Sequence, residues 1–459
     1  MIVKHFKLSQ PEKDRLIRIK AKTGIQNWNV LCRWALCWSL AEPSIPGGVD
    51  PLSDSNVEMD WSTFAGEYSE IYEAIIRQRC VNDGLGDDEK TLAKYFRLHL
   101  NRGINHYSTR DVLKNCSDLL KSEGGSIMAI YLDYNASAPI DERVLERMVD
   151  VYRSHYGNAD SRTHIFGTDA KEIVASARKT IAEILAVDST DVFFTSGSTE
   201  SNNMAILGLL DYALESGRNH FITTSIEHKS VLESMKHLQE KGCVVDFVSP
   251  DTSGRIKPKQ ILDLVTDKTL LVSMMHVNSE TGVIQPIEEV GAALAGTKTY
   301  FHVDATQGFG KLNGSLRNAK YNMLSITAHK LGGPQGIGAL IIRRDRTYRR
   351  PPVKQLMYGG QQERGYRPGT TPVALVAGFA LAAELCNKEA SDHMGKCKAI
   401  KQNFMEAIQG LNYTLNGDQE YCLPSTVNIS FRGVDAEGIF LAVKEDYAFS
   451  NGSACNSGS

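Results

Sequence analysis

The spacing of apolar residues changes character near residue 121 of the chain. Before that point the pattern is mainly helical, and after it short apolar runs of strand length alternate with helical or loop segments. The intervening segment KSEGGSIMA (Lys121–Ala129) has the polar, glycine-containing composition of a linker. We therefore predict a small, mainly α domain over residues 1–120, a linker over residues 121–129 and an α/β domain over residues 130–459.

Signals at both ends frame the first predicted helix. Ser9 and Glu12 have the spacing of a capping box, with Pro11 tolerated in the first turn. Gly24 follows as a plausible stop.

The next segment, NWNVLCRWALCWSLAEP, is apolar nearly all round, which predicts a buried helix that Pro43 ends. Trp34 and Trp38 lie four positions apart in this run, so we interpret them as core rather than as base-stacking residues. Cys32 and Cys37 should be buried as well. Two further helices are predicted in GEYSEIYEAIIRQRC and TLAKYFRLHLNRGI.

The second part of the chain is rich in strand-like runs. IYLDY directly after the linker has the pattern of a buried strand, and six further runs have strand length: DVFFTSG, FITTS, LLVSMMHV, TYFHVDA, NMLSITA and GALIIRR. Their alternation with helical or loop segments predicts an α/β domain whose large sheet is mostly parallel.

Composition excludes several classes of protein. The net charge of -3 gives no global attraction to nucleic acid, so any basic surface must be local. No apolar run reaches the roughly 18 residues of a membrane span, and the N-terminus lacks the apolar core of a secretory signal. The 9 cysteines form no C-x-x-C pair, which argues against a disulfide framework or a zinc site. We predict a cytoplasmic protein.

Two motifs after predicted strands suggest an anion site and a charged ligand contact. In TSGSTESNN, the turn at Gly197 leads into a helix, where Ser198 and Thr199 would offer amides and hydroxyls to a phosphate. A plain N-capped helix is the alternative. In HVDATQG, Asp304 could hold a protonated ring nitrogen, or could simply cap the next turn.

Two nucleophiles complete the candidate chemistry. Lys330 stands between an apolar strand and a glycine-rich turn, where burial would free its amine, although such a lysine is usually exposed. Cys455 lies in the tail NGSACNSGS, whose polar residues favour a reactive thiolate on a mobile arm. The alternative is an inert surface cysteine. A phosphate seat, an aspartate and a lysine are the parts of a pyridoxal phosphate site, and a mobile thiol adds a sulfur acceptor.

Residues from about Ile130 onward resemble the NifS/IscS class of cysteine desulfurases, which are fold-type I pyridoxal phosphate enzymes. The motifs that carry the resemblance occur in this order: YLDYNASAP, GNADSRTHIFG, TSGSTESNN, SIEHKSV, MHVNSETGVIQPI, HVDATQ, AHKLGGPQGIGAL, GGQQERGYRPGT and NGSAC.

The resemblance implies a role for each matching residue. Lys330 would carry the cofactor as a Schiff base and shuttle protons, and Cys455 would take the sulfur of L-cysteine as a persulfide, releasing alanine. The resemblance also implies that His228 stacks on the ring face, that Asp304 contacts the ring nitrogen and that Gln307 contacts the phenolic oxygen. The residues that would bind the phosphate are Ser198, Thr199, Thr327 and His329, with Thr370 from the second subunit of a homodimer. Asn278 would hold the ring or the substrate carboxylate, and Asn135 would lie near the substrate.

The sequence departs from this family in two places. It ends shortly after Cys455, before the IRFSLG-like strand whose arginine holds the substrate carboxylate, so we expect an incomplete small domain. YNASAP also replaces the usual pair of threonines. One alternative is therefore a DNA-binding or scaffold protein with an impaired desulfurase half. Transamination is disfavoured because it has no use for a mobile thiol, while selenocysteine stays open as a side substrate.

The first part of the chain resembles DndE, a small protein of DNA phosphorothioation systems. The resemblance rests on KHFKLS, KTGIQNWNVLCRWALCWSLAEPSIP, DSNVEM, GEY, RQRC and DEKTLAKYFRLHLNRGI. In those systems the desulfurase DndA supplies the sulfur that enters DNA, so the fusion would join two partners of one pathway. The resemblance implies that other Dnd proteins accept the sulfur and that the chain forms a homodimer or a higher homo-oligomer.

Basic residues gather at the start of this part. Such a cluster is most often a solvated helix face, but the DndE resemblance favours contacts with DNA phosphates. The candidate DNA-binding residues are Lys4, Lys7, Arg15, Arg18, Lys20 and Lys22.

Overall fold

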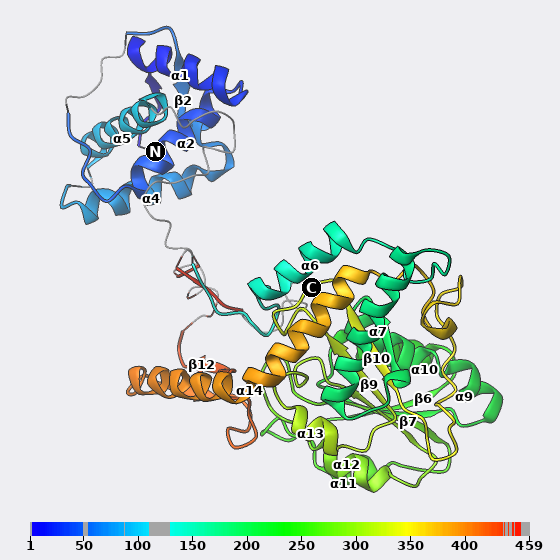
Figure 1. Ribbon diagram of the computed structural model, residues 1–459. Coiled ribbons are helices and arrows are strands. Elements are labelled where there is room, and N and C mark those ends of the chain that lie inside the picture. The colour runs from blue at the N-terminus through cyan, green and yellow to red at the C-terminus, as the bar shows by residue number, and fades with distance from the viewer. Residues whose placement is uncertain are drawn as a thin grey trace. The chain divides into compact units, whose positions relative to one another are not determined.

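The computed structural model describes residues 2–48, 54–86, 88–109 and 129–434, with positions 436, 439, 443, 444 and 446–450 beyond them. Its contacts divide the chain into two compact units, Met1–Met128 and Ala129–Ser459 (Figure 1). The predicted linker up to residue 128 and the thiol of Cys455 lie outside the described residues.

The first unit is mainly helical, as the sequence predicts. Two short antiparallel strands pair beside the helices. The elements are β1 (His5–Lys7), α1 (Gln10–Thr23), α2 (Trp28–Ala41), β2 (Glu58–Asp60), α3 (Trp61–Ala65), a 3-10 turn η1 (Gly66–Tyr68), α4 (Ser69–Asn82) and α5 (Glu89–Thr109). Helix α5 packs against α1, α2 and α4, and an aromatic cluster fills the core between them.

The capping signals of α1 are confirmed. The Ser9 amide donates to Glu12 Oε2 at 2.7 Å, and the Glu12 amide donates to Ser9 Oγ at 3.4 Å. Gly24 ends the helix with φ 74°, in the left-handed region that glycine adopts without a steric penalty.

The prediction that α2 is buried all round was wrong. Only one face of it is fully buried, including Cys32, because α2 packs along α5 in a small unit that cannot enclose a whole helix. Cys37 is exposed, and Trp34 and Trp38 are half-buried against the core. Trp38 stacks on His106 with ring centroids 3.5 Å apart, so the tryptophans serve packing.

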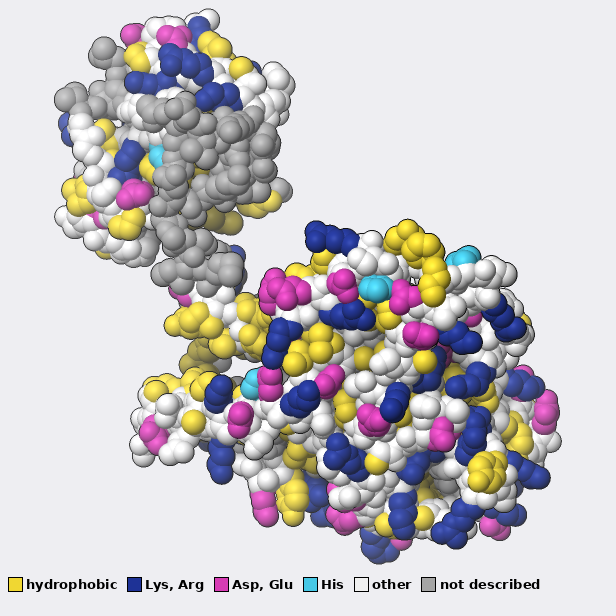
Figure 2. Space-filling model, in the orientation of Figure 1, with side chains coloured by type: hydrophobic (Ala, Val, Ile, Leu, Met, Phe, Trp, Pro, Cys, Tyr) yellow, Lys and Arg dark blue, Asp and Glu magenta, His cyan; other side chains and the backbone are white. Residues whose placement is uncertain are grey.

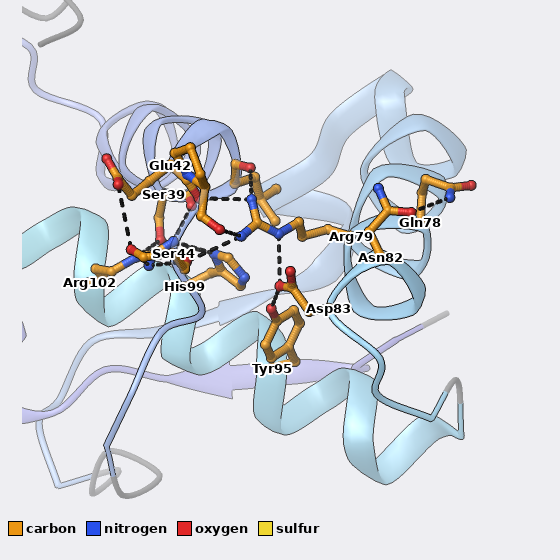
Figure 3. Close-up of polar contacts among 12 residues, drawn as sticks. Ser39, Glu42, Ser44, Gln78, Arg79, Asn82, Asp83, Tyr95, His99 and Arg102 are labelled. Carbon is orange, nitrogen blue, oxygen red and sulfur yellow. Dashed lines mark hydrogen bonds and ion pairs between the residues drawn. The ribbon is translucent and has the colours of Figure 1, made fainter. Parts of the chain in front are cut away.

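Two arginines fasten the segment after α2 to the other helices (Figure 3). Arg79 on α4 donates to the carbonyl oxygens of Leu40 and Glu42, each at 2.8 Å, and its Nε pairs with Asp83 at 2.8 Å. Arg102 on α5 donates from Nη1 to the Ser44 carbonyl at 2.6 Å and from Nε to Ser39 Oγ at 2.7 Å. Side chains from α4 and α5 thereby satisfy carbonyl groups at and beyond the C-terminus of α2.

The second unit is built on a seven-stranded sheet in the order β4-β10-β9-β8-β7-β5-β6. Its strands are β4 (Val192–Thr195), β5 (His220–Thr224), β6 (Val244–Val248), β7 (Thr269–Met275), β8 (Tyr300–Asp304), β9 (Met323–Thr327) and β10 (Gly338–Ile342). Only β10 runs antiparallel to its neighbours, which confirms a mostly parallel sheet. Strand β6 was not predicted from the sequence.

Helices cover both faces of this sheet (Figure 1). One face packs against helices that include α6, α7, α12 and α14, and the other packs against α8 and α10. The helices and 3-10 turns of this unit are α6 (Glu142–Ser154), α7 (Ile165–Leu185), η3 (Ser189–Asp191), α8 (Ser198–Leu207), α9 (Leu210–Ser216), α10 (Lys229–Glu240), α11 (Pro258–Leu262), α12 (Ile287–Leu294), α13 (Asn313–Asn318), η4 (Gln362–Gly365) and α14 (Val373–Ala407).

Among the described residues of the second unit, two small sheets lie outside the large one. Strand β3 (Ile130–Tyr131) runs parallel to β13 (Tyr447–Ala448), and β11 (Tyr413–Leu415) runs antiparallel to β12 (Ile429–Phe431). The expectation of a buried strand at IYLDY was wrong, because Ile130 is 50% exposed and β3 pairs with a single two-residue strand. Within the described part of the chain, no helix is both long and apolar enough to cross a membrane.

Candidate active site

A cavity of about 1470 Å³ opens at the carboxyl ends of the parallel strands in the second unit. Residues that directly follow β4, β5, β8 and β9 line it, although they are far apart in the sequence. Open α/β sheets place their ligands at this edge. Of the predicted site residues, those in the wall are Asn135, Ser198, Thr199, His228, Asp304, Gln307, Thr327, His329 and Lys330.

The predicted phosphate seat is a tight turn from β4 into α8. Gly197 has φ 154°, and a Cβ on Gly338 in the neighbouring strand would lie 2.7 Å from the Gly197 Cα, so only glycine allows this approach. Ser198 and Thr199 begin the helix, where amides point outward and favour an anion. Thr306 Oγ1 donates to Ser198 Oγ at 2.6 Å, which joins the seat to the loop after β8.

Asp304 is a buried carboxylate held by neutral donors. Asn202 Nδ2 donates to its Oδ2 at 2.8 Å, and the Thr306 amide donates to its Oδ1 at 3.0 Å. One oxygen of Asp304 therefore caps the following turn, while the side chain also lines the cavity, and its contact with a ring nitrogen stays a prediction. A buried carboxylate fixed in this way suits a protonated ring nitrogen.

His228 begins α10 and is held in one tautomer. The Ser230 amide donates to its Nδ1 at 3.1 Å, which leaves the ring proton on Nε2. Burial, opposed by Asp304 but assisted by Lys330, lowers the pKa of His228. The imidazole is therefore neutral at neutral pH and can lie against a flat ring without a charge of its own.

Lys330 and its neighbours follow β9. Thr327 is buried at the strand end, and its Oγ1 lies 3.0 Å from His329 Nδ1. Burial, followed by the charge of Lys330, lowers the pKa of His329. Lys330 itself is half-buried in the cavity wall, near both histidines.

Comparison with known proteins decides the family. Residues 130–458 match the family model described as aminotransferase class-V. Cysteine desulfurase IscS of Pasteurella multocida is 40% identical over 335 residues, which cover 72% of this chain and 82% of that protein. The crystal structure of DndA from Streptomyces lividans is 42% identical with a TM-score of 0.63, covering 68% of this chain and 87% of that one.

The chain belongs to the cysteine desulfurase family. Residues 5–115 match a second family model, that of the DNA sulphur modification protein DndE. A solved structure of SspA in complex with cysteine is also similar, at 35% identity and a TM-score of 0.63, and covers 72% of this chain and 91% of that one. The fusion of a DndE domain with a desulfurase domain is thus confirmed.

Aminotransferase class-V cysteine desulfurases use pyridoxal 5'-phosphate, and the cavity fits this group. The seat at Gly197 and Ser198 suits its phosphate, buried Asp304 suits its ring nitrogen, and half-buried Lys330 supplies the amine. No group of three or more side chains able to hold a metal ion occurs among the described residues.

Two predicted residues, Asn278 and Thr370, are not part of the cavity lining of this desulfurase domain. Asn278 is buried beneath the wall, and its Oδ1 accepts the amide of Thr281 at 2.9 Å, so it holds a turn. Thr370 is exposed outside the cavity, after the η4 turn. Asn135 does lie in the wall, where its Nδ2 donates to Thr426 Oγ1 at 3.0 Å.

Two titratable residues near this site, Glu227 and Lys311, were not predicted from the sequence. Glu227 precedes His228 and is fully enclosed, which raises its pKa to about 8. Its Oε1 accepts from Thr224 Oγ1 at 2.6 Å, while Oε2 has no hydrogen-bond partner in the described structure. Lys311 donates to Gln307 Oε1 at 3.0 Å. The only sequence signals were that Glu227 lies within SIEHKSV, next to His228, and that Lys311 lies four residues after Gln307.

Proposed function

We propose that this cysteine desulfurase transfers the sulfur of L-cysteine to Cys455 and passes it on for DNA phosphorothioate modification. The main support is one cavity that holds Lys330, Asp304 and His228 beside an anion seat, in a chain that also carries a DndE domain. Other Dnd sulfur-modification proteins would be the acceptors.

Bound pyridoxal phosphate would act as an electron sink for the substrate carbon. Lys330 would hold the cofactor and later move a proton at the substrate's α-carbon, while Asp304 keeps the ring nitrogen protonated. His228, neutral and fixed by Ser230, would lie over the ring face. Ser198, Thr199, Thr327 and His329 would bind the phosphate, with Thr370 from a second subunit.

The sulfur transfer needs no oxidant or reductant besides the enzyme and its substrate. The Cys455 thiolate would attack the substrate sulfur, so that an S–S bond forms while the Cβ–S bond breaks. The electron pair stays with the substrate carbon, which takes up a proton and leaves as alanine. The persulfide sulfur is then available to an acceptor.

A single-turnover assay tests this function. The 459-residue chain is loaded with pyridoxal phosphate and mixed with L-cysteine, and alanine and protein persulfide are quantified together. We expect alanine and persulfide in equal amounts. Cofactor binding without either product would contradict the proposal and favour a DNA-binding scaffold with an impaired desulfurase half.

We further infer that α1 of the DndE domain contacts DNA phosphates. Lys and Arg side chains gather over α1 on the face seen in Figure 2. Arg18 and Lys22 are exposed and Arg15 is half-buried, whereas Leu16 and Ile19 face the core. Exposed cations along one helix face add salt-dependent affinity for a phosphate backbone.

The remaining candidates flank this face. Lys20 lies over the Trp28 ring, 4.5 Å from its centroid, which holds the ammonium near the surface. Lys4 is exposed and Lys7 is half-buried, at and beside strand β1.

A further inference from the structure

Lys311 lies directly behind a residue of the cavity wall. Gln307 lines the cavity, whereas Lys311 is absent from the lining but contacts the same side-chain amide. Lys311 Nζ donates to Gln307 Oε1 at 3.0 Å. Both belong to the turn that follows β8, where the Leu312 amide donates to the Gly308 carbonyl at 2.8 Å.

Two hydrogen bonds of the Gln307 side chain leave one of its two amide N–H donors for a further partner. Oε1 accepts from Lys311, and Nε2 donates one hydrogen to the Asn135 carbonyl at 2.7 Å. A primary amide nitrogen carries two hydrogens, so a second N–H remains on a side chain of the cavity wall. Exchanging the amide oxygen and nitrogen would oppose Lys311 with a donor and the Asn135 carbonyl with an acceptor, so these partners select one orientation.

Burial makes the charged form of Lys311 costly, so packing alone does not explain a lysine at this position. Burial and then the charge of Lys330 lower its pKa to about 8, partly offset by the thiols of Cys386 and Cys397 on α14. The amine keeps an N–H to donate on either side of this pKa. The orientation of Gln307 is therefore preserved across neutral pH.

We propose that Lys311 is a positioning residue that turns the N–H of Gln307 toward the cavity, where it meets an anionic oxygen on the cofactor ring. The inference deepens the proposed function, because it rests on the predicted contact of Gln307 with the phenolic oxygen. Lys311 then influences the electronic state of the cofactor without touching it.

The test is spectroscopic and needs no substrate. The chain is loaded with pyridoxal phosphate and its visible absorbance is titrated with pH. A donor to the phenolic oxygen stabilises its negative charge, so Lys311→Met should raise the midpoint by about 0.5–1 pH unit, the equivalent of one hydrogen bond. Lys311→Arg keeps a donor and should stay near wild type. Lys311→Ala serves as a second variant if the methionine form does not fold.

A Gln307→Ala background separates positioning from the direct effect of the lysine charge. We expect Lys311→Met to cause no further shift there, because the amide through which it acts is gone. An equal shift in both backgrounds would overturn the proposal, as would an unshifted midpoint in Lys311→Met. Absence of a visible band in the loaded wild-type chain, or its persistence in Lys330→Ala, would instead overturn the proposed function itself.

Discussion

Glu227 and Asp304 are buried carboxylates whose partners give them different chemistry. Asp304 receives hydrogen bonds on both oxygens from Asn202 and Thr306. Glu227 receives them on one oxygen only, and burial raises its pKa to about 8. Asp304 thus has donors on both oxygens beside the cavity, whereas Glu227 holds a proton at neutral pH.

The proton on Glu227 makes stability depend on pH. The folded pKa is about 8 against 4.5 for the unconstrained side chain, so the folded protein binds more protons in this window. Stability from this group is greatest below pH 4.5 and is lost as the pH rises through about 8. We expect Glu227→Gln to gain free energy of unfolding relative to wild type between pH 5 and pH 9.

Urea unfolding of the cofactor-free chain, followed by circular dichroism at both pH values, measures this difference. Glu233→Gln, on the exposed face of α10, is the matched control and should follow wild type. Parallel pH curves for Glu227→Gln and wild type would show that Glu227 is ionised in the folded protein.

The identity of the sulfur-accepting thiol is a second prediction at this scale. Cys397 on α14 lines the cavity, so it provides an internal control for Cys455. Cys455→Ser should bind cofactor and cysteine but lose persulfide formation, whereas Cys397→Ser should retain it. Mass spectrometry of peptides after a single turnover locates the extra sulfur. Persulfide on Cys397, or undiminished release of sulfide from Cys455→Ser, would reject the assigned nucleophile.

At the level of elements, the DndE domain depends on side chains that bridge its helices. Arg79 connects α4 to the segment after α2, and one change would remove the ion-pair partner of Asp83 and the donor to several carbonyl groups. Such bridges act at long sequence separation, so helix propensity alone does not reveal them.

We expect Arg79→Met to destabilise this domain by about 2–4 kcal/mol, the cost of breaking a half-buried ion pair and its accompanying hydrogen bonds. The chain has 4 tryptophans, Trp28, Trp34, Trp38 and Trp61, and all lie in the first unit. Tryptophan fluorescence during urea unfolding therefore reports on this unit alone. Gln78→Ala, one residue away on the exposed side of α4, should cost less than about 1 kcal/mol. Equal effects of the two variants would contradict a bridging role.

At the scale of the whole molecule, the two units bring a desulfurase and a DNA-modification domain into one chain. Reversing the charge of Arg15, Arg18 and Lys22 to glutamate should weaken DNA binding and flatten its salt dependence. Each lost phosphate contact reduces the slope of log K against log salt by about 0.9.

Fluorescence anisotropy with a labelled duplex at several salt concentrations measures both effects. Lys236, Lys241 and Lys259 are exposed on the second unit, and reversing them gives the same change in net charge. If the two triple variants lose affinity equally, net charge rather than the α1 face governs binding. Alanine formation from cysteine should be unchanged in the α1 variant.

Much of the architecture was predictable because its signals are contiguous. The capping box at Ser9, the strand runs and the turn at Gly197 each lie within a few residues, so local backbone preferences express them directly. Strand β6 was missed because Asp246 interrupts its VVDFV run, which lies half-exposed at the edge of the sheet. Cys37 was misplaced because apolar character on a helix does not say how much of its circumference the neighbouring helices cover.

The sequence by itself determined the family, the mostly parallel sheet and the residues that end its strands. Only the tertiary structure decided which of these residues line the same cavity and which buried groups contact that lining. Lys311 became relevant only when the turn after β8 brought it to Gln307, and Glu227 only when the surrounding elements excluded water from it. The physical reason is that burial, and with it pKa and hydrogen-bond satisfaction, depends on neighbours that chain order does not specify.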